Sequence, residues 1–206
     1  MSIKDIIVRA IRITLIPSAE WQTIAEEKSS LSTLFFNYSL FLIMFSAIGR
    51  TIGISFIVFP FYKFSSELWL ALGFYFLYWT VFSLLLIIAI TYILNWILRI
   101  LKFDTKIIKS AKLVVYSFTP LFLFSFIIFI HPVLHVLIPV GILVFALYII
   151  FILWYGIRNL FEGKNNPKVA YYIIAVIVIF LVFTFGQILS FKLLKIFFPL
   201  LNLLYF

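Results

Sequence analysis

A stretch of 45 residues, from Leu113 to Ile157, contains no Lys, Arg, Asp or Glu. A run this long and apolar indicates a membrane. At about 1.5 Å per residue a single helix would be about 68 Å long, more than twice the ~30 Å of bilayer hydrocarbon. The chain must therefore fold back within this stretch, and His131-Pro132, with Pro139 after it, marks the turn.

Three more uncharged runs, at residues 31–49, 68–98 and 169–191, are each long enough to cross a bilayer as a helix. With the two halves of the central stretch they predict an all-α, polytopic integral membrane protein, a helical bundle with five spans. We expect a cytoplasmic, interfacial segment at residues 1–30 and a five-span transmembrane domain at residues 31–206. A chain of 206 residues leaves no room for a separate soluble domain.

The segment ahead of the first span is predicted to be a basic amphipathic helix. Its apolar residues recur at three- and four-residue steps, and its charged residues share the opposite side: Ile3, Ile6, Ile7, Ala10 and Ile13 against Asp5, Arg9 and Arg12. Such a helix lies in the plane of the membrane interface. Pro17 ends it, and Ser18 is expected to cap a second short helix that runs to Lys28. The second helix carries an acidic cluster: Glu20, Glu26 and Glu27.

The net charge of +9 is distributed unevenly along the chain. We expect the second loop at residues 99–112 and the fourth at residues 158–168. With five spans, twelve Lys and Arg residues fall on the side of the N-terminal segment and these two loops, against three on the other side. The positive-inside rule then places the N-terminus in the cytoplasm and the C-terminus outside. Because these charges flank apolar spans, they indicate membrane lipids as partners and argue against nucleic acid.

Arg50 is an ionisable residue inside a predicted span, and Asn37 is a polar residue of the same span. An intramembrane charge is by default a contact to an ion, a substrate or a lipid phosphate, so Arg50 and Asn37 form a candidate intramembrane polar site. The alternative is that Arg50 marks the outer interface and reaches the headgroups. Beside it, Gly49 and Gly53 have the spacing that permits close helix approach, which leaves homo-oligomerisation open.

The sequence carries no enzyme signature. It has no zinc-protease, phosphate-loop or nucleophile-elbow motif, and the spans contain no carboxylate that could act as a base. His131 and His135 have the i, i+4 spacing of some zinc ligands, but Pro132 lies between them and no third ligand accompanies them. Since the chain also has no cysteine, we expect neither a metal nor another cofactor.

Three stretches carry a family resemblance. The first precedes the first span: Pro17, Trp21, Ile24, Glu26 and Glu27. The second opens the third span: Tyr116, Ser117 and Pro120. The third ends the fourth span and enters the fifth: Leu147, Tyr148, Tyr155, Gly156, Ile157, Pro167, Lys168 and Ala170. In these residues and in its five spans the chain resembles the Yip family (Ypt/Rab-interacting membrane proteins), especially its short prokaryotic branch.

The resemblance implies a helical membrane protein without established enzymatic chemistry. The eukaryotic members are linked to Rab GTPases and to the shape of secretory-pathway membranes, whereas this chain has only about 30 residues ahead of its first span. That difference favours a multi-pass protein of the bacterial inner membrane. The positions that the family motifs mark as candidates are Trp21, Glu26, Glu27, Tyr116 and Pro120.

Two functions follow from these observations. The leading one is a non-enzymatic membrane protein that acts by interaction with protein partners or lipids at its cytoplasmic face. It is favoured by the basic amphipathic helix and the acidic cluster next to it. The alternative is a transporter or channel for a small anionic solute or lipid, in which Arg50 attracts the anionic group.

Overall fold

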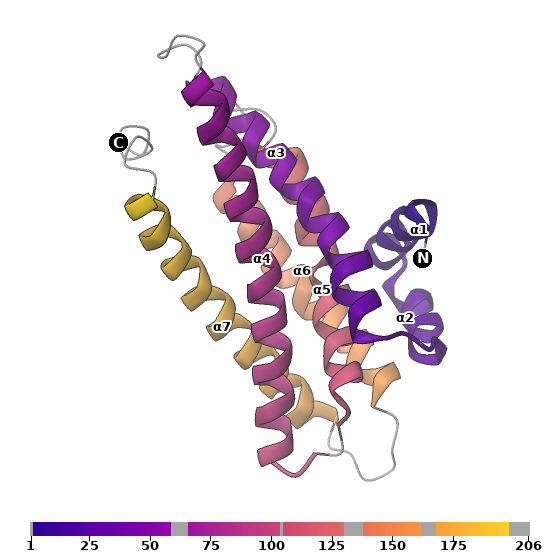
Figure 1. Ribbon diagram of the computed structural model, residues 1–206. Coiled ribbons are helices and arrows are strands. Elements are labelled where there is room, and N and C mark those ends of the chain that lie inside the picture. Colours follow the sequence, from indigo (N-terminus) through magenta and orange to yellow (C-terminus); the bar gives the residue numbers. More distant parts are fainter. Residues whose placement is uncertain (1, 59–65, 104, 130–137, 162–167, 198–206) are drawn as a thin grey trace.

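The computed structural model describes residues 2–58, 66–103, 105–129, 138–161 and 168–197. The regular structure in these ranges is helical, and five of the helices are long and apolar enough to cross a membrane (Figure 1). The predicted all-α bundle with five candidate spans is therefore confirmed. The turn expected at His131-Pro132 lies outside the described residues.

The helices follow one another along the chain, each of the long ones reversing direction. They are α1 (Ile3–Leu15), α2 (Pro17–Glu26), the π-helical segment η1 (Thr33–Ser39) that continues into α3 (Leu40–Val58), α4 (Ser66–Ile100), α5 (Ile107–Phe129), α6 (Ile138–Leu160) and α7 (Lys168–Phe197). The last turns of α4 and α6 and the first turns of α5 and α7 lie at the same end of the bundle (Figure 1).

The two N-terminal helices begin differently. In α1, the Ser2 hydroxyl accepts a hydrogen bond from the Asp5 N–H at 3.2 Å, and the Asp5 carboxylate accepts one from the Ser2 N–H at 2.9 Å. These hydrogen bonds hold the pKa of Asp5 below its ordinary value. The expected cap at Ser18 is wrong, because α2 already begins at Pro17 and no side chain caps it. Proline suits the first helical position, where no N–H is needed.

The basic loop before the third span is shorter than the sequence suggested. We expected it to extend to Lys112, but α5 begins at Ile107, so Lys109 and Lys112 are helical. Both lysines have partners that favour this: the Lys109 ammonium lies 5.4 Å from the ring centroid of Phe161, and Lys112 binds the end of α2. At the other end of the chain, α7 continues past Lys192, where the fifth span was expected to stop.

Helix α5 is the centre of the bundle. It packs against α3, α4, α6 and α1, and every residue from Ser110 to Pro120 is buried. Helix α7 packs against α4 and α6, while α1 and α2 lie on the flank of the bundle against α5 and α6 (Figure 1). The buried side chains of α1 and α2, including Ile13 and Trp21, belong to the same hydrophobic core as the spans. The N-terminal pair is thus part of the folded bundle.

Gly49 sets the distance between α3 and α5. A Cβ atom at this position would lie 2.7 Å from both the Cα atom and the carbonyl oxygen of Phe126. Because these are backbone atoms, the two helices would have to separate to admit a side chain. The close approach predicted at Gly49 is therefore used within the chain.

Candidate functional site

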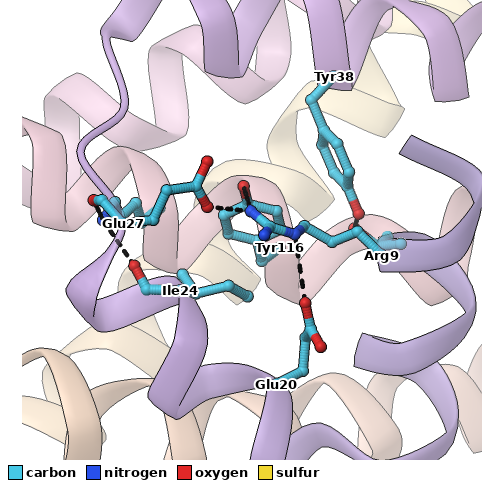
Figure 2. A network of polar contacts seen from close by, with 8 residues as sticks. Arg9, Glu20, Ile24, Glu27, Tyr38 and Tyr116 are labelled. Atoms are coloured by element: carbon cyan, nitrogen blue, oxygen red, sulfur yellow. Dashed lines mark hydrogen bonds and ion pairs between the residues drawn. The ribbon is translucent and has the colours of Figure 1, made fainter. Parts of the chain in front are cut away.

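The side chain of Arg9 joins α1 to α2 and α5. Its Nε atom lies 3.2 Å from Oε1 of Glu20, and its Nη1 atom forms an ion pair with Glu27 and donates a hydrogen bond to the Tyr116 hydroxyl at 3.1 Å (Figure 2). The side chain of Arg9 is only 16% exposed and that of Glu20 only 7%. Charged hydrogen bonds in such a protected place are stronger than surface ion pairs.

Lys112 of α5 holds the end of α2. Its Nζ atom donates hydrogen bonds to the carbonyl oxygens of Ile24, at 2.6 Å, and Glu27, at 2.5 Å. The last carbonyls of a helix have no partner within the helix and carry partial negative charge, so an ammonium group stabilises them. We call Arg9, Glu20, Glu27, Lys112 and Tyr116 the N-terminal clamp. Its two cations balance its two carboxylates.

The Arg9 guanidinium stays charged inside the N-terminal clamp. Burial alone would lower the pKa of Arg9, but the contacts with Tyr116 and Glu27 outweigh burial and leave this pKa above its ordinary value. The ion pairs therefore do not depend on pH through Arg9. The contacts of the guanidinium join α1 to the acidic residues of the α2 segment and to Tyr116 of α5.

Two further aromatic rings pack against Tyr116 of the N-terminal clamp. The Tyr116 ring makes edge contacts with Trp21, at a centroid distance of 6.0 Å, and with Tyr38 of η1, at 4.8 Å. The Tyr38 hydroxyl lies 3.0 Å from Oγ1 of Thr119. Tyr38 comes from the π-helical turns of η1, a rare geometry that is frequent at functional sites. Aromatic packing thus fixes the Tyr116 ring on which Arg9 rests.

Trp21 is fully buried between α5 and α6 because Gly156 leaves room for it. A Cβ atom at Gly156 would lie 2.8 Å from Cζ2 of Trp21 and 2.7 Å from Cδ1 of Leu113. Among the described residues the Trp21 indole N–H has no hydrogen-bond partner, so its position depends on packing. One helical turn after Tyr116, Pro120 has no N–H to donate to the Tyr116 carbonyl, which weakens the α5 backbone beside the clamp.

The structure brings together most of the residues that the family motifs marked. Trp21, Glu27 and Tyr116 are in contact with one another or with Arg9, and Pro120 is buried one turn farther along α5. Two residues of the third motif join them, since Gly156 receives Trp21 and the Tyr148 hydroxyl donates a hydrogen bond to the Thr14 carbonyl. Glu26 is different: it is exposed on the outer side of α2.

The structure does not bring Arg50 and Asn37 together. Arg50 is half-buried on α3, with its Cζ atom 4.4 Å from the ring centroid of Trp79 on α4. Asn37 is exposed on η1. Position 50 is thirteen residues after position 37 on continuous helix, which corresponds to about 20 Å. Trp79 belongs to a second, smaller hydrophobic cluster, which also contains Ala47, so Arg50 lies beside this cluster at the other end of the bundle.

Sequence reasoning missed three members of the N-terminal clamp: Arg9, Glu20 and Lys112. It interpreted the two cations as headgroup contacts, because each one alone resembles an ordinary charge beside a span. A signal for Glu20 and Glu27 was present. Along α2 they share a helical face with the apolar residue Ile24, which is the face that a helix buries.

The contacts of the N-terminal clamp are those of a structural ion-pair network that joins helices. Its carboxylates are paired with cations, and its lysine is occupied by two carbonyl groups. In the part of the chain that the structure describes, no three His, Asp or Glu side chains are grouped so that they could hold a metal ion. The His131 and His135 pair lies outside that part.

Most of the chain matches a known protein family. Residues 11–186 match the family model of the Yip1 domain, so the match runs from α1 into α7 and includes the acidic and aromatic residues of the N-terminal clamp. No curated protein and no solved structure matches the chain.

Proposed function

Because the chain belongs to the Yip1 domain family, we propose that it acts as a non-enzymatic membrane protein, by binding other molecules at its cytoplasmic face. The observation that carries the proposal is the N-terminal clamp. Burying charges has a desolvation cost. A chain that uses buried charges to hold a short helix pair therefore favours a function in which the outer surface of that pair must keep a fixed position. We therefore assign the binding surface to the outer side of α2.

The outer side of α2 is polar and faces away from the bundle core. Its exposed residues are Ser18, Ala19, Gln22, Thr23 and Glu26. Next to it in sequence, Lys28 is also exposed. Such a surface is polar and accessible to solvent, as the rim of a protein interface is. A membrane or cytoplasmic protein is the partner that fits it.

The basic end of the bundle is proposed to be cytoplasmic. Of the twelve Lys and Arg residues counted on that side, Arg9 and Lys112 are used in the N-terminal clamp, which leaves ten against three. The bias still favours a cytoplasmic N-terminus and an outer C-terminus, in a bacterial inner membrane. Residues 1–30 would then be the interfacial segment, fastened to the five-span domain of residues 31–206.

Photo-crosslinking tests the proposal. A photoreactive amino acid replaces Gln22 on the outer side of α2, and the matched control replaces Phe185, which is exposed on α7. In native membranes we expect a discrete protein adduct from position 22 and only lipid adducts from position 185. The adduct at position 22 should weaken when Arg9→Ala releases the clamp.

The contradictory result is equally plain. Lipid adducts alone from both positions, unchanged by Arg9→Ala, would rule out a protein partner on α2. In that case the search would return to the transport alternative, with anion flux compared between the native protein and Arg50→Ala.

A further inference from the structure

Helix α1 has two apolar faces, and the bundle covers only one of them. Ile6, Ala10 and Ile13 are buried against the bundle. A second set of apolar side chains is 41–72% exposed and continues over the link to α2: Ile3, Ile7, Val8, Ile11, Leu15 and Ile16. Monomeric proteins rarely expose so many large apolar side chains in water. The second face therefore needs a cover.

The position of α1 along the spans indicates what covers this second apolar face. Tyr148 of α6 donates its hydrogen bond to the carbonyl of Thr14, so the end of α1 lies beside residue 148. From Tyr148 to Leu160, where α6 ends, the helical rise amounts to about 18 Å. The headgroup layer is only about 5–8 Å thick on each side of a bilayer. With the end of α6 at the water side of the headgroup layer, the end of α1 is about 10 Å inside the hydrocarbon.

The neighbouring surface of α6 is of the same kind. Leu147 and Phe151, which flank Tyr148 in the sequence, are 61% and 46% exposed. In a helix that crosses a membrane, such side chains contact acyl chains. The outer face of α1 continues this lipid-facing surface, with Leu15, at 72% exposed, beside the level of Tyr148. A covering protein would have to interrupt it.

The charged residues of α1 also indicate that lipid covers its outer face. Lys4 and Arg12 of α1 are exposed, and long basic side chains extend from the acyl region toward the headgroups. Helix α2 returns toward the basic end of the bundle, because its last carbonyls bind Lys112 near the start of α5. The outer side of α2 is polar, as described above. The boundary between lipid and water therefore passes between the outer faces of α1 and α2.

We propose that α1 and α2 form a re-entrant hairpin in one leaflet of the membrane. The outer face of α1 contacts acyl chains, the link at Leu15-Ile16 is the deepest point, and Lys4 and Arg12 bind the phosphates of anionic phospholipids. This assignment does not rest on a protein partner at α2. It holds whether or not the outer side of α2 binds one.

The absence of cysteine from the sequence makes the test direct. Single cysteines replace Ile11 and Leu15 on the outer face of α1, with Gln22→Cys on α2 as the matched control. All three residues are exposed, so the fold should tolerate the changes. The protein is placed in vesicles of phosphatidylcholine with one quarter phosphatidylglycerol, and reaction with a water-soluble maleimide is followed.

We expect the thiols at positions 11 and 15 to react at least about tenfold more slowly than the thiol at position 22. A thiol in hydrocarbon stays protonated, and each unit of its raised pKa removes tenfold of the reactive thiolate. Spin labels at positions 11 and 15 should be reached by oxygen, which dissolves in lipid, and should be shielded from a water-soluble nickel complex.

Two results would overturn the assignment. Equal maleimide rates at all three positions would place the outer face of α1 in water. Labels at positions 11 and 15 that neither oxygen nor nickel reaches would show that protein, either a partner or a second copy of the chain, covers the face.

The headgroup contact has its own test. The double variant with Lys4→Gln and Arg12→Gln should have a reduced preference for phosphatidylglycerol over phosphatidylcholine vesicles. An unchanged preference would refute the headgroup contact.

Discussion

Each end of the bundle places an arginine over an aromatic ring, and the two arginines have different surroundings. At the end that holds the N-terminal pair, the Cζ atom of Arg9 lies 5.7 Å from the ring centroid of Tyr116, and two carboxylates flank the guanidinium. At the other end, the Cζ atom of Arg50 lies 4.4 Å from the ring centroid of Trp79 on the next helix. Arg9 fastens helices that are distant in sequence, whereas Arg50 packs between consecutive ones.

The difference teaches that position within an apolar run is a poor guide to where a membrane protein concentrates its polar interactions. Arg50 stands out because its neighbours in sequence are uncharged. The N-terminal clamp is assembled from residues 9, 20, 27, 112 and 116, and each of these looks ordinary in its local sequence. Only the fold reveals that they meet.

Removing Arg9 should have the largest effect. Arg9→Ala leaves Glu20 buried without its cation, and breaking a buried pair in this way costs about 3–5 kcal/mol. We expect α1 and α2 to detach, so that trypsin cleaves rapidly at the exposed Lys28. The matched control Arg99→Ala, at an exposed position near the end of α4, should change little. If Arg50→Ala sensitised Lys28 as much as Arg9→Ala does, the contrast between the two ends would fail.

Replacing Lys112 should have the next largest effect. Lys112→Met keeps the length of the side chain but leaves the carbonyls of Ile24 and Glu27 without their donor, a loss of about 1.5–3 kcal/mol. Lys109→Met, on the same helix, removes only a contact with the Phe161 ring and should cost less. Hydrogen exchange of the last turn of α2 measures this directly. Equal exchange in the two variants would remove Lys112 from the clamp.

Gly156→Ala tests the room made for Trp21. The added Cβ atom meets the rigid indole ring, so we expect a loss of about 1–3 kcal/mol from overpacking. At Gly73 an added Cβ atom would have no atom of the described residues within 4 Å, so Gly73→Ala should be neutral or stabilise α4 by up to about 1 kcal/mol. Thermal unfolding in detergent compares the two variants. Similar melting temperatures for both would mean that Trp21 is not wedged at Gly156.

Tyr38→Phe should have the smallest effect. It removes the hydrogen bond with Thr119 and should cost about 1 kcal/mol. Tyr78→Phe, toward the other end, removes hydrogen bonds to Ser190 and is expected to cost a similar amount. Only Tyr38→Phe should also increase trypsin cleavage at Lys28, because Tyr38 supports the Tyr116 ring. Increased cleavage with Tyr78→Phe would show that the two ends are coupled.

The sequence was sufficient for the general fold. Apolar runs report directly on the bilayer, so the five candidate spans and the amphipathic character of α1 were predictable from length and periodicity. One local error came from a contact between distant segments: helix α5 starts earlier than expected because Lys112 has a partner on α2. The other was local, since α2 starts at Pro17 because proline suits the first helical position.

The candidate site was predictable only in fragments. The family motifs marked Trp21, Glu27 and Tyr116, which do lie together, but nothing local to Arg9 distinguishes it from Arg12. Both are basic residues on the polar side of the same amphipathic helix. The difference arises because Arg9 lies where α1 packs against α5 and reaches Tyr116, whereas Arg12 is exposed.

A double-mutant cycle between Arg9 and Glu20 tests the central claim most directly. Arg9→Met and Glu20→Gln keep the approximate size of each side chain, and the stability of each variant and of the pair is measured by unfolding in mixed detergents. If the buried ion pair fastens the N-terminal helices, the interaction energy should be about 1–3 kcal/mol. Effects that add within about 0.3–0.5 kcal/mol would mean that the two residues act independently, and would contradict the clamp.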